Sequence, residues 1–136
     1  MSMSDVQATF GGVWKHVRSE NLDEYLKSRG IEDAVARKAV AEAYCTMTIR
    51  ADGGVGTIRM ESTYVFEYTF VLGKFEISDP HAKGKAFASY KNGKLSIAVN
   101  TDIGEEVVER EIIDGDLVQT MYLRGVVCKR HFKKIG

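Results

Sequence analysis

The chain has 136 residues, 44% apolar and 28% charged, a composition typical of one soluble globular domain spanning residues 1–136. Its 19 basic and 19 acidic residues give a formal net charge of zero, which argues against nucleic-acid binding driven by charge. No apolar run approaches the roughly 18 residues that span a bilayer. The two cysteines, Cys45 and Cys128, are too few for a disulfide scaffold or a zinc site, and we expect both to be reduced and buried.

A short helical segment interrupts an otherwise strand-like pattern near the N-terminus. After a first strand, apolar residues recur at helical spacing, and Asn21 with Glu24 predicts a capping box at the start of a helix that ends at Gly30. A second short helix is expected over Asp33–Ala41. Neither helix is long or basic enough to be a DNA recognition helix.

From Tyr44 onward, apolar and polar residues alternate with period 2, which predicts strands. Asn92-Gly93 is the strongest hairpin signal among the turns that separate them. Short antiparallel strands joined by tight turns favour an all-β, closed or nearly closed barrel of ten strands, with the two helices covering one mouth. Such a barrel has a lumen that can hold one small apolar ligand. The expected strands are Gly11–Arg18, Tyr44–Arg50, Gly56–Ser62, Tyr64–Leu72, Lys74–Ile77, Lys85–Tyr90, Lys94–Asn100, Glu105–Ile113, Leu117–Leu123 and Val126–Lys133.

Two arginines lie in the middle of strands in the last third of the chain. Arg130 shares a strand face with Cys128 and Phe132, so the alternation predicts that it points inward, and Arg110 lies on one definite face of its own strand. A guanidinium in the interior is costly unless an anion meets it. The pattern leaves three alternatives: a carboxylate of the protein, an acidic ligand, or an outward position if the register is shifted by one residue.

Several stretches resemble one known family. Residues 10–15, Phe-Gly-Gly-Val-Trp-Lys, are similar to the Phe-x-Gly-x-Trp-Lys opening of the intracellular lipid-binding proteins, the fatty-acid-binding and retinoid-binding family. The resemblance extends to the lid helices (19–27 and 36–38), the middle strands (57–64 and 70–73) and the final hairpin (124–132). It implies a ten-stranded β-clam of the lipocalin-like kind, with a helical lid over a water-filled cavity and with neither catalysis nor a cofactor.

The resemblance also implies a site for a lipid carboxylate. The family holds it with two arginines and a tyrosine in an Arg-x-Tyr pair, which correspond here to Arg110, Arg130 and Phe132, with Phe132 in place of the tyrosine. Losing that hydroxyl removes one hydrogen bond to a charged partner, worth about 1.5–3 kcal/mol. Both arginines are retained, which favours an acidic ligand over an alcohol or an aldehyde. Plain core packing is the preferred interpretation of Phe132.

Two further groups of residues follow from the family match. Positions that would line the portal or lumen, with Tyr64 as the gate, are Leu22, Tyr25, Leu26, Ile31, Ala36, Tyr64, Met121 and Cys128. Lys27, Arg37 and Lys38 are best interpreted as a solvated helix face. The alternative is a basic patch that touches anionic membranes or supports nuclear import.

Enzymatic and metal sites have little support in the sequence. His131 alternates with Arg130 and is expected to face solvent, opposite to Cys128, so a Cys–His pair cannot form. His16 and His81 lie near no cluster of metal ligands.

We therefore expect a monomeric carrier that binds a long-chain fatty acid, or a similar acidic lipid, and passes it to membranes, enzymes or nuclear receptors. The alternatives are a retinoic-acid carrier and a membrane-associated structural protein. Residues 1–7 lack the pattern of a signal peptide, which favours a cytoplasmic location, with or without a nuclear one. A mature secreted form would begin in the same way, so secretion from a longer precursor stays an alternative.

Overall fold

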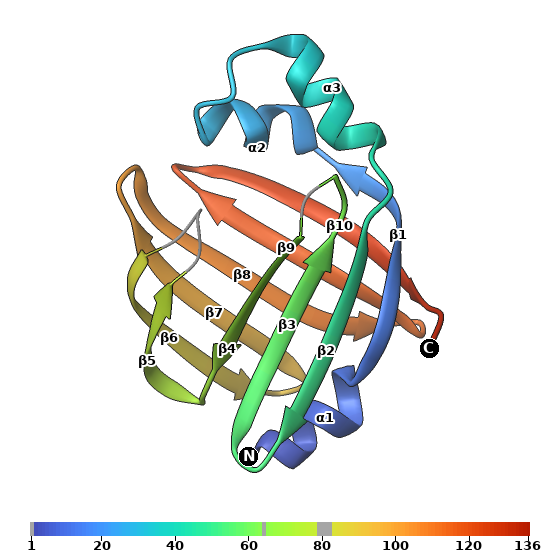
Figure 1. Ribbon diagram of the computed structural model, residues 1–136, viewed down its shortest axis with the longest axis vertical. Helices are drawn as coiled ribbons and strands as arrows, with labels where there is room; N and C mark the ends of the chain where they lie inside the picture. The colour runs from blue at the N-terminus through green and yellow to red at the C-terminus, as the bar shows by residue number, and fades with distance from the viewer. Residues whose placement is uncertain (1, 64, 79–82) are drawn as a thin grey trace.

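The computed structural model describes residues 2–63, 65–78 and 83–136, and it forms a barrel of antiparallel strands with helices at both ends (Figure 1). The helices of these residues are α1 (Met3–Phe10), α2 (Leu22–Ser28) and α3 (Ala34–Glu42). The strands are β1 (Gly12–Glu20), β2 (Thr46–Asp52), β3 (Val55–Glu61), β4 (Val65–Phe70), β5 (Gly73–Ser78), β6 (Lys83–Lys91), β7 (Lys94–Thr101), β8 (Gly104–Ile113), β9 (Asp116–Leu123) and β10 (Val126–Lys134).

All strands belong to one sheet, in the order β4-β3-β2-β1-β10-β9-β8-β7-β6-β5. Strands β2 to β4 and strands β5 to β10 pair in chain order as hairpins, β1 pairs with β2 across the lid helices, and the pairing of β1 with β10 joins the two halves of the sheet. Strands β4 and β5 are the two ends of this order, so the barrel is nearly closed. The predicted ten-stranded barrel with a two-helix lid between the first and second strands is confirmed.

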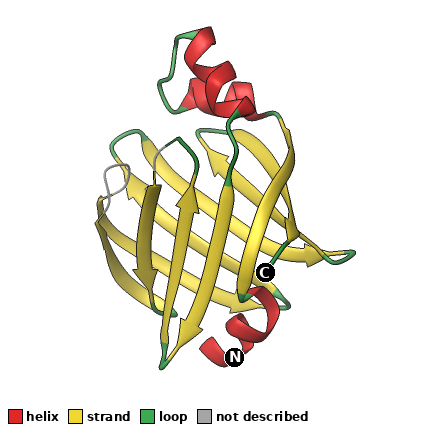
Figure 2. Ribbon diagram, turned by 45° about the vertical axis from the view of Figure 1, so that its right-hand side comes forward, coloured by secondary structure: helices red, strands yellow, loops and turns green. Residues whose placement is uncertain are grey.

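Helices α2 and α3 lie over one mouth of the barrel, and α1 lies at the opposite end (Figure 2). Helix α1 was not among the predicted elements. Asp5 Oδ2 accepts a hydrogen bond from the backbone N–H of Ser2 at 2.9 Å, which secures the start of the helix. Met3, Val6 and Phe10 then lie buried against the barrel. This short helix forms because tertiary packing covers its apolar face.

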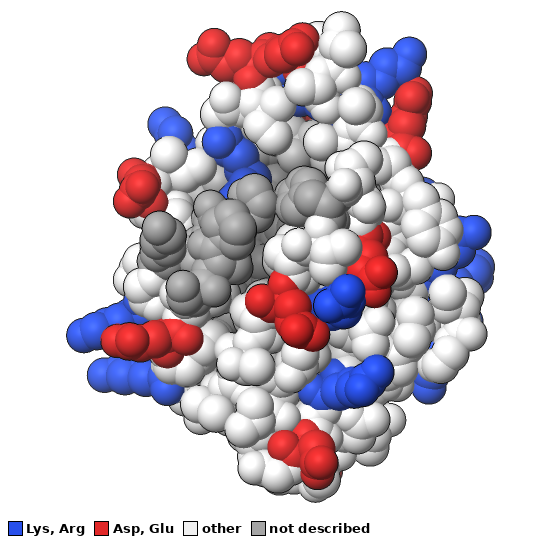
Figure 3. All heavy atoms as spheres, in the orientation of Figure 1, with Lys and Arg blue, Asp and Glu red and all other residues white. Residues whose placement is uncertain are grey.

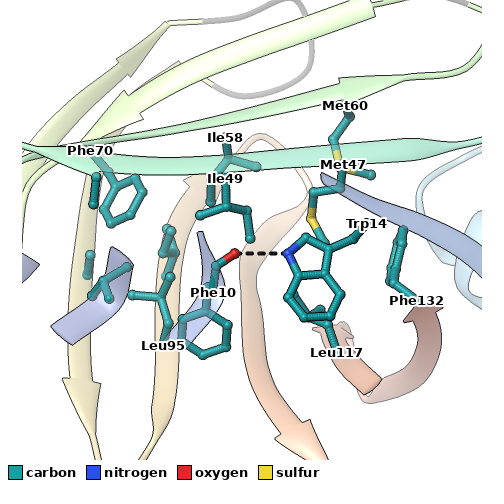
Figure 4. Close-up of a cluster of buried hydrophobic side chains, with 14 of the residues drawn as sticks. Phe10, Trp14, Met47, Ile49, Ile58, Met60, Phe70, Leu95, Leu117 and Phe132 are labelled. Carbon is teal, nitrogen blue, oxygen red and sulfur yellow. Dashed lines mark hydrogen bonds between the residues drawn. The ribbon is translucent and has the colours of Figure 1, made fainter. Parts of the chain in front are cut away.

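The core fills the end of the barrel near α1 (Figure 4). Trp14 is buried there, and its indole Nε1 donates a hydrogen bond of 2.8 Å to the backbone oxygen of Phe10, which satisfies the one polar atom of the ring. Phe132 is fully buried in the same cluster and meets the ring of His16 edge-on at 5.6 Å between centroids. Packing at this end leaves the internal space of the barrel near the helical lid.

Arg37 holds the lid together, and this corrects the prediction that it lies on a solvated helix face. Its side chain is buried, its Nε donates to Asp23 Oδ1 at 2.6 Å, and one terminal nitrogen donates to the backbone oxygens of Ile31 and Glu32 at 2.9 and 2.7 Å. These contacts join α3 to α2 and to the turn between them. The helical pattern of α3 alone could not show this because the partners lie on another helix.

The capping box predicted at Asn21 is also wrong. Asn21 has a left-handed backbone conformation, with φ of 62°, and its side chain makes no capping hydrogen bond. Instead, its Nδ2 donates to the backbone oxygen of Val127 at 2.9 Å, which ties the start of α2 to β10. Within the described residues, no helix combines the length and apolar character needed to cross a membrane.

Candidate ligand-binding site

A cavity of about 280 Å³ lies between the lid and the inner faces of the strands. This volume is close to the lower end of the range of about 300–1,000 Å³ that is usual for small-molecule sites. Its wall is mainly apolar and includes Met60, Phe66, Ile97, Val108 and Met121. Charged side chains reach it in two places, with Arg110 and Arg130 in the barrel and with Arg29 and Glu106 at the lid.

Arg110 supplies the deepest polar contact. It lies on β8, is only 3% exposed, and lines the cavity. Its Nε donates to Gln119 Oε1 at 3.0 Å, but its Nη1 is buried and has no hydrogen-bond partner in the described part of the chain. A buried cationic donor without a partner costs several kcal/mol, of order 1–3 for the hydrogen bond alone. The arrangement is suited to an anion in the cavity.

Gln119, which sequence reasoning missed, fixes the orientation of Arg110. It is buried on β9, and its Nε2 contacts Met121 Sδ at 3.4 Å while its oxygen accepts from Arg110. The alternation of Leu117, Gln119 and Met121 along β9 was the available signal, because it places a glutamine among inward-facing apolar residues.

Arg130 lies on β10 and also lines the cavity, so the inward orientation expected for it holds. Its Nε donates to Ser19 Oγ at 3.3 Å, and its guanidinium lies 5.8 Å from the centre of the Phe132 ring. Ser19 is in turn hydrogen-bonded to His16 Nε2 at 2.7 Å. Burial and the positive charge of Arg130 lower the pKa of His16 to about 4, so this ring is neutral near pH 7.

The strand register places these groups in one row across the sheet. Arg110 pairs with Gln119, Gln119 pairs with Arg130, and Arg130 pairs with Ser19. Neighbouring strands are about 4.8 Å apart, so the two arginine backbones are separated by roughly 10 Å with Gln119 between them. Neither arginine forms an ion pair with a carboxylate of the described residues. Of the alternatives left open by the sequence, the internal ion pair is therefore absent from that part of the structure.

The other predicted site residues divide between the cavity wall and its surroundings. Leu22, Tyr25, Leu26, Ile31 and Met121 line the cavity. Cys128 is fully buried beneath α2 and Ala36 is partly buried on α3, and neither reaches the wall. Phe132 is also off the wall, in the core. Tyr64 lies outside the described residues. Both cysteines are free and buried, as expected, and Cys45 lines the cavity.

The remaining basic lid residues are exposed but paired. Lys27 Nζ lies 3.1 Å from Glu24 Oε1 and 3.7 Å from Asp23 Oδ2, and Lys38 Nζ lies 3.9 Å from Glu42 Oε1. Charges of both signs are mixed over the face shown in Figure 3. With Arg37 buried, the predicted patch of Lys27, Arg37 and Lys38 does not form as one basic surface.

His131 differs from expectation in its degree of exposure. It lies on the opposite strand face from Arg130, but only 14% of its side chain is exposed because Glu20 covers it, with Oε2 at 2.6 Å from Nε2. This pairing lowers the pKa of Glu20. His131 is therefore a structural contact between β1 and β10.

A second polar group at the lid was not predicted. Tyr25 and Arg29, from α2 and its C-terminus, both donate hydrogen bonds to Oε2 of Glu106 on β8. Burial and the nearby Glu106 raise the pKa of Tyr25, so its hydroxyl stays protonated. Burial opposes the charged form of Arg29, but the interactions with Glu106 and Tyr25 together outweigh it and raise the pKa of this group. Residues this far apart in sequence meet only through the fold.

Comparison with known proteins finds relatives over nearly the whole chain. The chain is 34% identical over 128 residues to the adipocyte fatty acid-binding protein of Pygoscelis papua, covering 92% of this chain and 96% of the relative. The chain belongs to the fatty-acid-binding protein family. The human intestinal fatty acid-binding protein is also 34% identical, over 130 residues, covering 92% of this chain and 98% of the relative. No family model matches.

Solved structures of fatty-acid-binding proteins share the fold. Echinococcus granulosus fatty-acid-binding protein 1 superposes with a TM-score of 0.82 at 27% identity, covering 93% of this chain and 98% of that one. The REP1-NXSQ fatty acid transporter gives a TM-score of 0.83 at 25% identity, covering 98% of both chains. The relatives are named for the binding or transport of fatty acids, in line with the expectation of a binding protein. No group of three or more candidate metal ligands occurs in the described residues.

Proposed function

We propose that the protein is an intracellular carrier that binds one long-chain fatty acid, or a similar acidic lipid, in the barrel cavity. The observation that carries the proposal is Arg110, which lines the cavity and whose buried Nη1 has no hydrogen-bond partner in the described residues. The carboxylate would accept from this nitrogen, and Arg130 would add a second positive charge from the neighbouring strands. Relatives named as fatty-acid-binding proteins support the choice of ligand class.

Phe132 gives the carboxylate no hydrogen bond, because its ring has no hydroxyl to donate, and it packs in the core. Gln119 compensates in part, because it holds the guanidinium of Arg110 in a fixed position before the ligand arrives. The apolar wall binds the tail, at about 0.8 kcal/mol for each methylene that it buries. The carboxylate thus sets the orientation of the lipid, and the tail supplies most of the affinity.

Titration with a fluorescent fatty acid tests the proposal. Arg110→Gln should weaken binding by about ten- to a hundredfold, because it removes one charge-assisted hydrogen bond. Arg50→Gln is the matched control, since Arg50 is exposed on β2 and should leave affinity unchanged. Unchanged affinity in folded Arg110→Gln would refute the carboxylate role.

Competition between oleic acid and retinoic acid separates the two acidic-lipid classes, and we expect preference for oleic acid. Release from the carrier is proposed to occur at membranes or receiving proteins. Sedimentation with anionic liposomes at low and high salt checks the membrane-associated alternative, which requires binding that falls as salt rises. With Lys27 and Lys38 paired and Arg37 buried, we expect little binding at either salt concentration.

A further inference from the structure

The cavity has a polar group at each end of one strand face. Glu106, Val108 and Arg110 alternate along β8, and all three line the cavity. At about 3.3 Å per residue, Glu106 and Arg110 are separated by roughly 13 Å along the strand. Val108 and its register partner Met121 form an apolar stretch between them. A ligand held at Arg110 by its carboxylate therefore passes apolar wall before it reaches Glu106.

The group at the lid end is neutral as a whole but rich in hydrogen-bonding atoms. Glu106 and Arg29 form an ion pair, with side chains 14% and 24% exposed, and Tyr25 donates to the same carboxylate oxygen. The other oxygen, Oε1 of Glu106, accepts no hydrogen bond from the described residues. A neutral hydroxyl can donate to this oxygen and accept from Arg29, whereas a second carboxylate would be repelled by Glu106.

We propose that Tyr25, Arg29 and Glu106 form a subsite for a hydroxyl group on the lipid tail. The inference rests on the proposed function, because the carboxylate at Arg110 sets the position of the tail. Carbon–carbon bonds of about 1.5 Å in an extended zigzag chain cover 13 Å in roughly ten to eleven bonds. The preferred ligand is therefore a long-chain fatty acid with a hydroxyl near carbon 12, and Glu106 determines this specificity.

Displacement of a fluorescent fatty acid from delipidated protein tests the subsite with three probes of equal chain length. These are octadecanoic acid, 12-hydroxyoctadecanoic acid and 2-hydroxyoctadecanoic acid. The 12-hydroxy acid should bind about ten- to a hundredfold more tightly than octadecanoic acid, as expected for a hydrogen bond to a charged group. The 2-hydroxy acid should show no such gain because its hydroxyl stays near Arg110.

The ratio of the affinity for 12-hydroxyoctadecanoic acid to the affinity for octadecanoic acid separates recognition of the hydroxyl from a role of Glu106 in holding the lid. Glu106→Leu should reduce the ratio to about one, while Glu105→Leu, on the exposed face of the same strand, should leave it unchanged. A lid role alone would change the affinity for both acids equally. An equal ratio in Glu106→Leu and wild type, or no preference in wild type, would overturn the subsite.

Binding of octadecanoic acid to wild type and to Arg110→Gln distinguishes failure of the hydroxyl subsite from failure of the proposed carrier function. Binding of octadecanoic acid that depends on Arg110, without preference for the 12-hydroxy acid, overturns the subsite and leaves the carrier function standing. Absence of any binding that depends on Arg110 overturns both.

Discussion

Replacing Arg110 with methionine is expected to stabilise the delipidated protein while it weakens ligand binding. Arg110 is 3% exposed and forms no ion pair with the described residues, so the folded state carries a buried charge without a counterion. Methionine is similar in length, apolar and flexible enough to fill the same space. Removing buried charges in this way typically adds about 1–4 kcal/mol to the free energy of unfolding.

Gln119 opposes part of this gain. In Arg110→Met its Oε1 loses the donor that it has at 3.0 Å, which costs about 1–3 kcal/mol for a buried acceptor. The single variant should therefore change the free energy of unfolding by only about 1 kcal/mol, in either direction. The double variant with Gln119→Leu removes both polar groups and should be more stable than wild type by about 2 kcal/mol.

Urea denaturation of delipidated protein measures both effects. With a slope of about 2 kcal/mol per M, a gain of 2 kcal/mol raises the midpoint by roughly 1 M. The double-mutant cycle isolates the coupling of the two side chains. Arg50→Met on the exposed face of β2 is the control and should shift stability by less than about 0.5 kcal/mol. A double variant less stable than wild type would show that Arg110 supports the fold and refute the reasoning.

Two further predictions concern the lid and the pH dependence. Arg37→Ala should lower the free energy of unfolding by about 2 kcal/mol and speed hydrogen exchange in α3, because three hydrogen bonds to the adjoining lid segments are lost. Lys38→Ala, at an exposed position of the same helix, is the control. Equal effects of the two substitutions would contradict the anchoring role of Arg37. The pKa of His16 is lowered in the folded state to about 4 from 6.5, so its contribution to stability is fully present above pH 6.5 and is lost as pH falls toward 4. Urea midpoints between pH 7 and 4 should therefore fall less steeply in His16→Gln than in wild type, and identical slopes would refute this.

The strands and turns could be predicted because their signals are local. Alternation gave the strand faces, and glycine at the second turn position marked the hairpins. Asn92-Gly93, Asp114-Gly115 and Arg124-Gly125 all have positive φ at both residues, from 52° to 84°, which is the backbone that tight antiparallel hairpins require. The inward orientation of Arg130 followed from the same alternation.

The missed features depend on contacts across the fold. Glu106 contacts Arg29 and Tyr25 because the fold places α2 over β8, and no local pattern in the sequence marks these contacts. Arg37 looked like one more charged residue on a helix face because its partners lie on α2 and the connecting turn. Helix α1 is too short for its sequence pattern to stand out, and it is stable because the barrel buries one side of it.

The ionisation of a bound fatty acid tests the central claim most directly. A carboxyl group in an apolar cavity has a raised pKa, while a buried guanidinium beside it lowers that pKa. With palmitic acid labelled with carbon-13 at the carboxyl carbon, NMR of the wild-type complex should show a signal that stays constant from pH 8 to 5. In Arg110→Gln, the remaining bound signal should titrate within that range. Titration of the carboxyl in the wild-type complex over the same range as in Arg110→Gln would contradict a carboxylate held by Arg110.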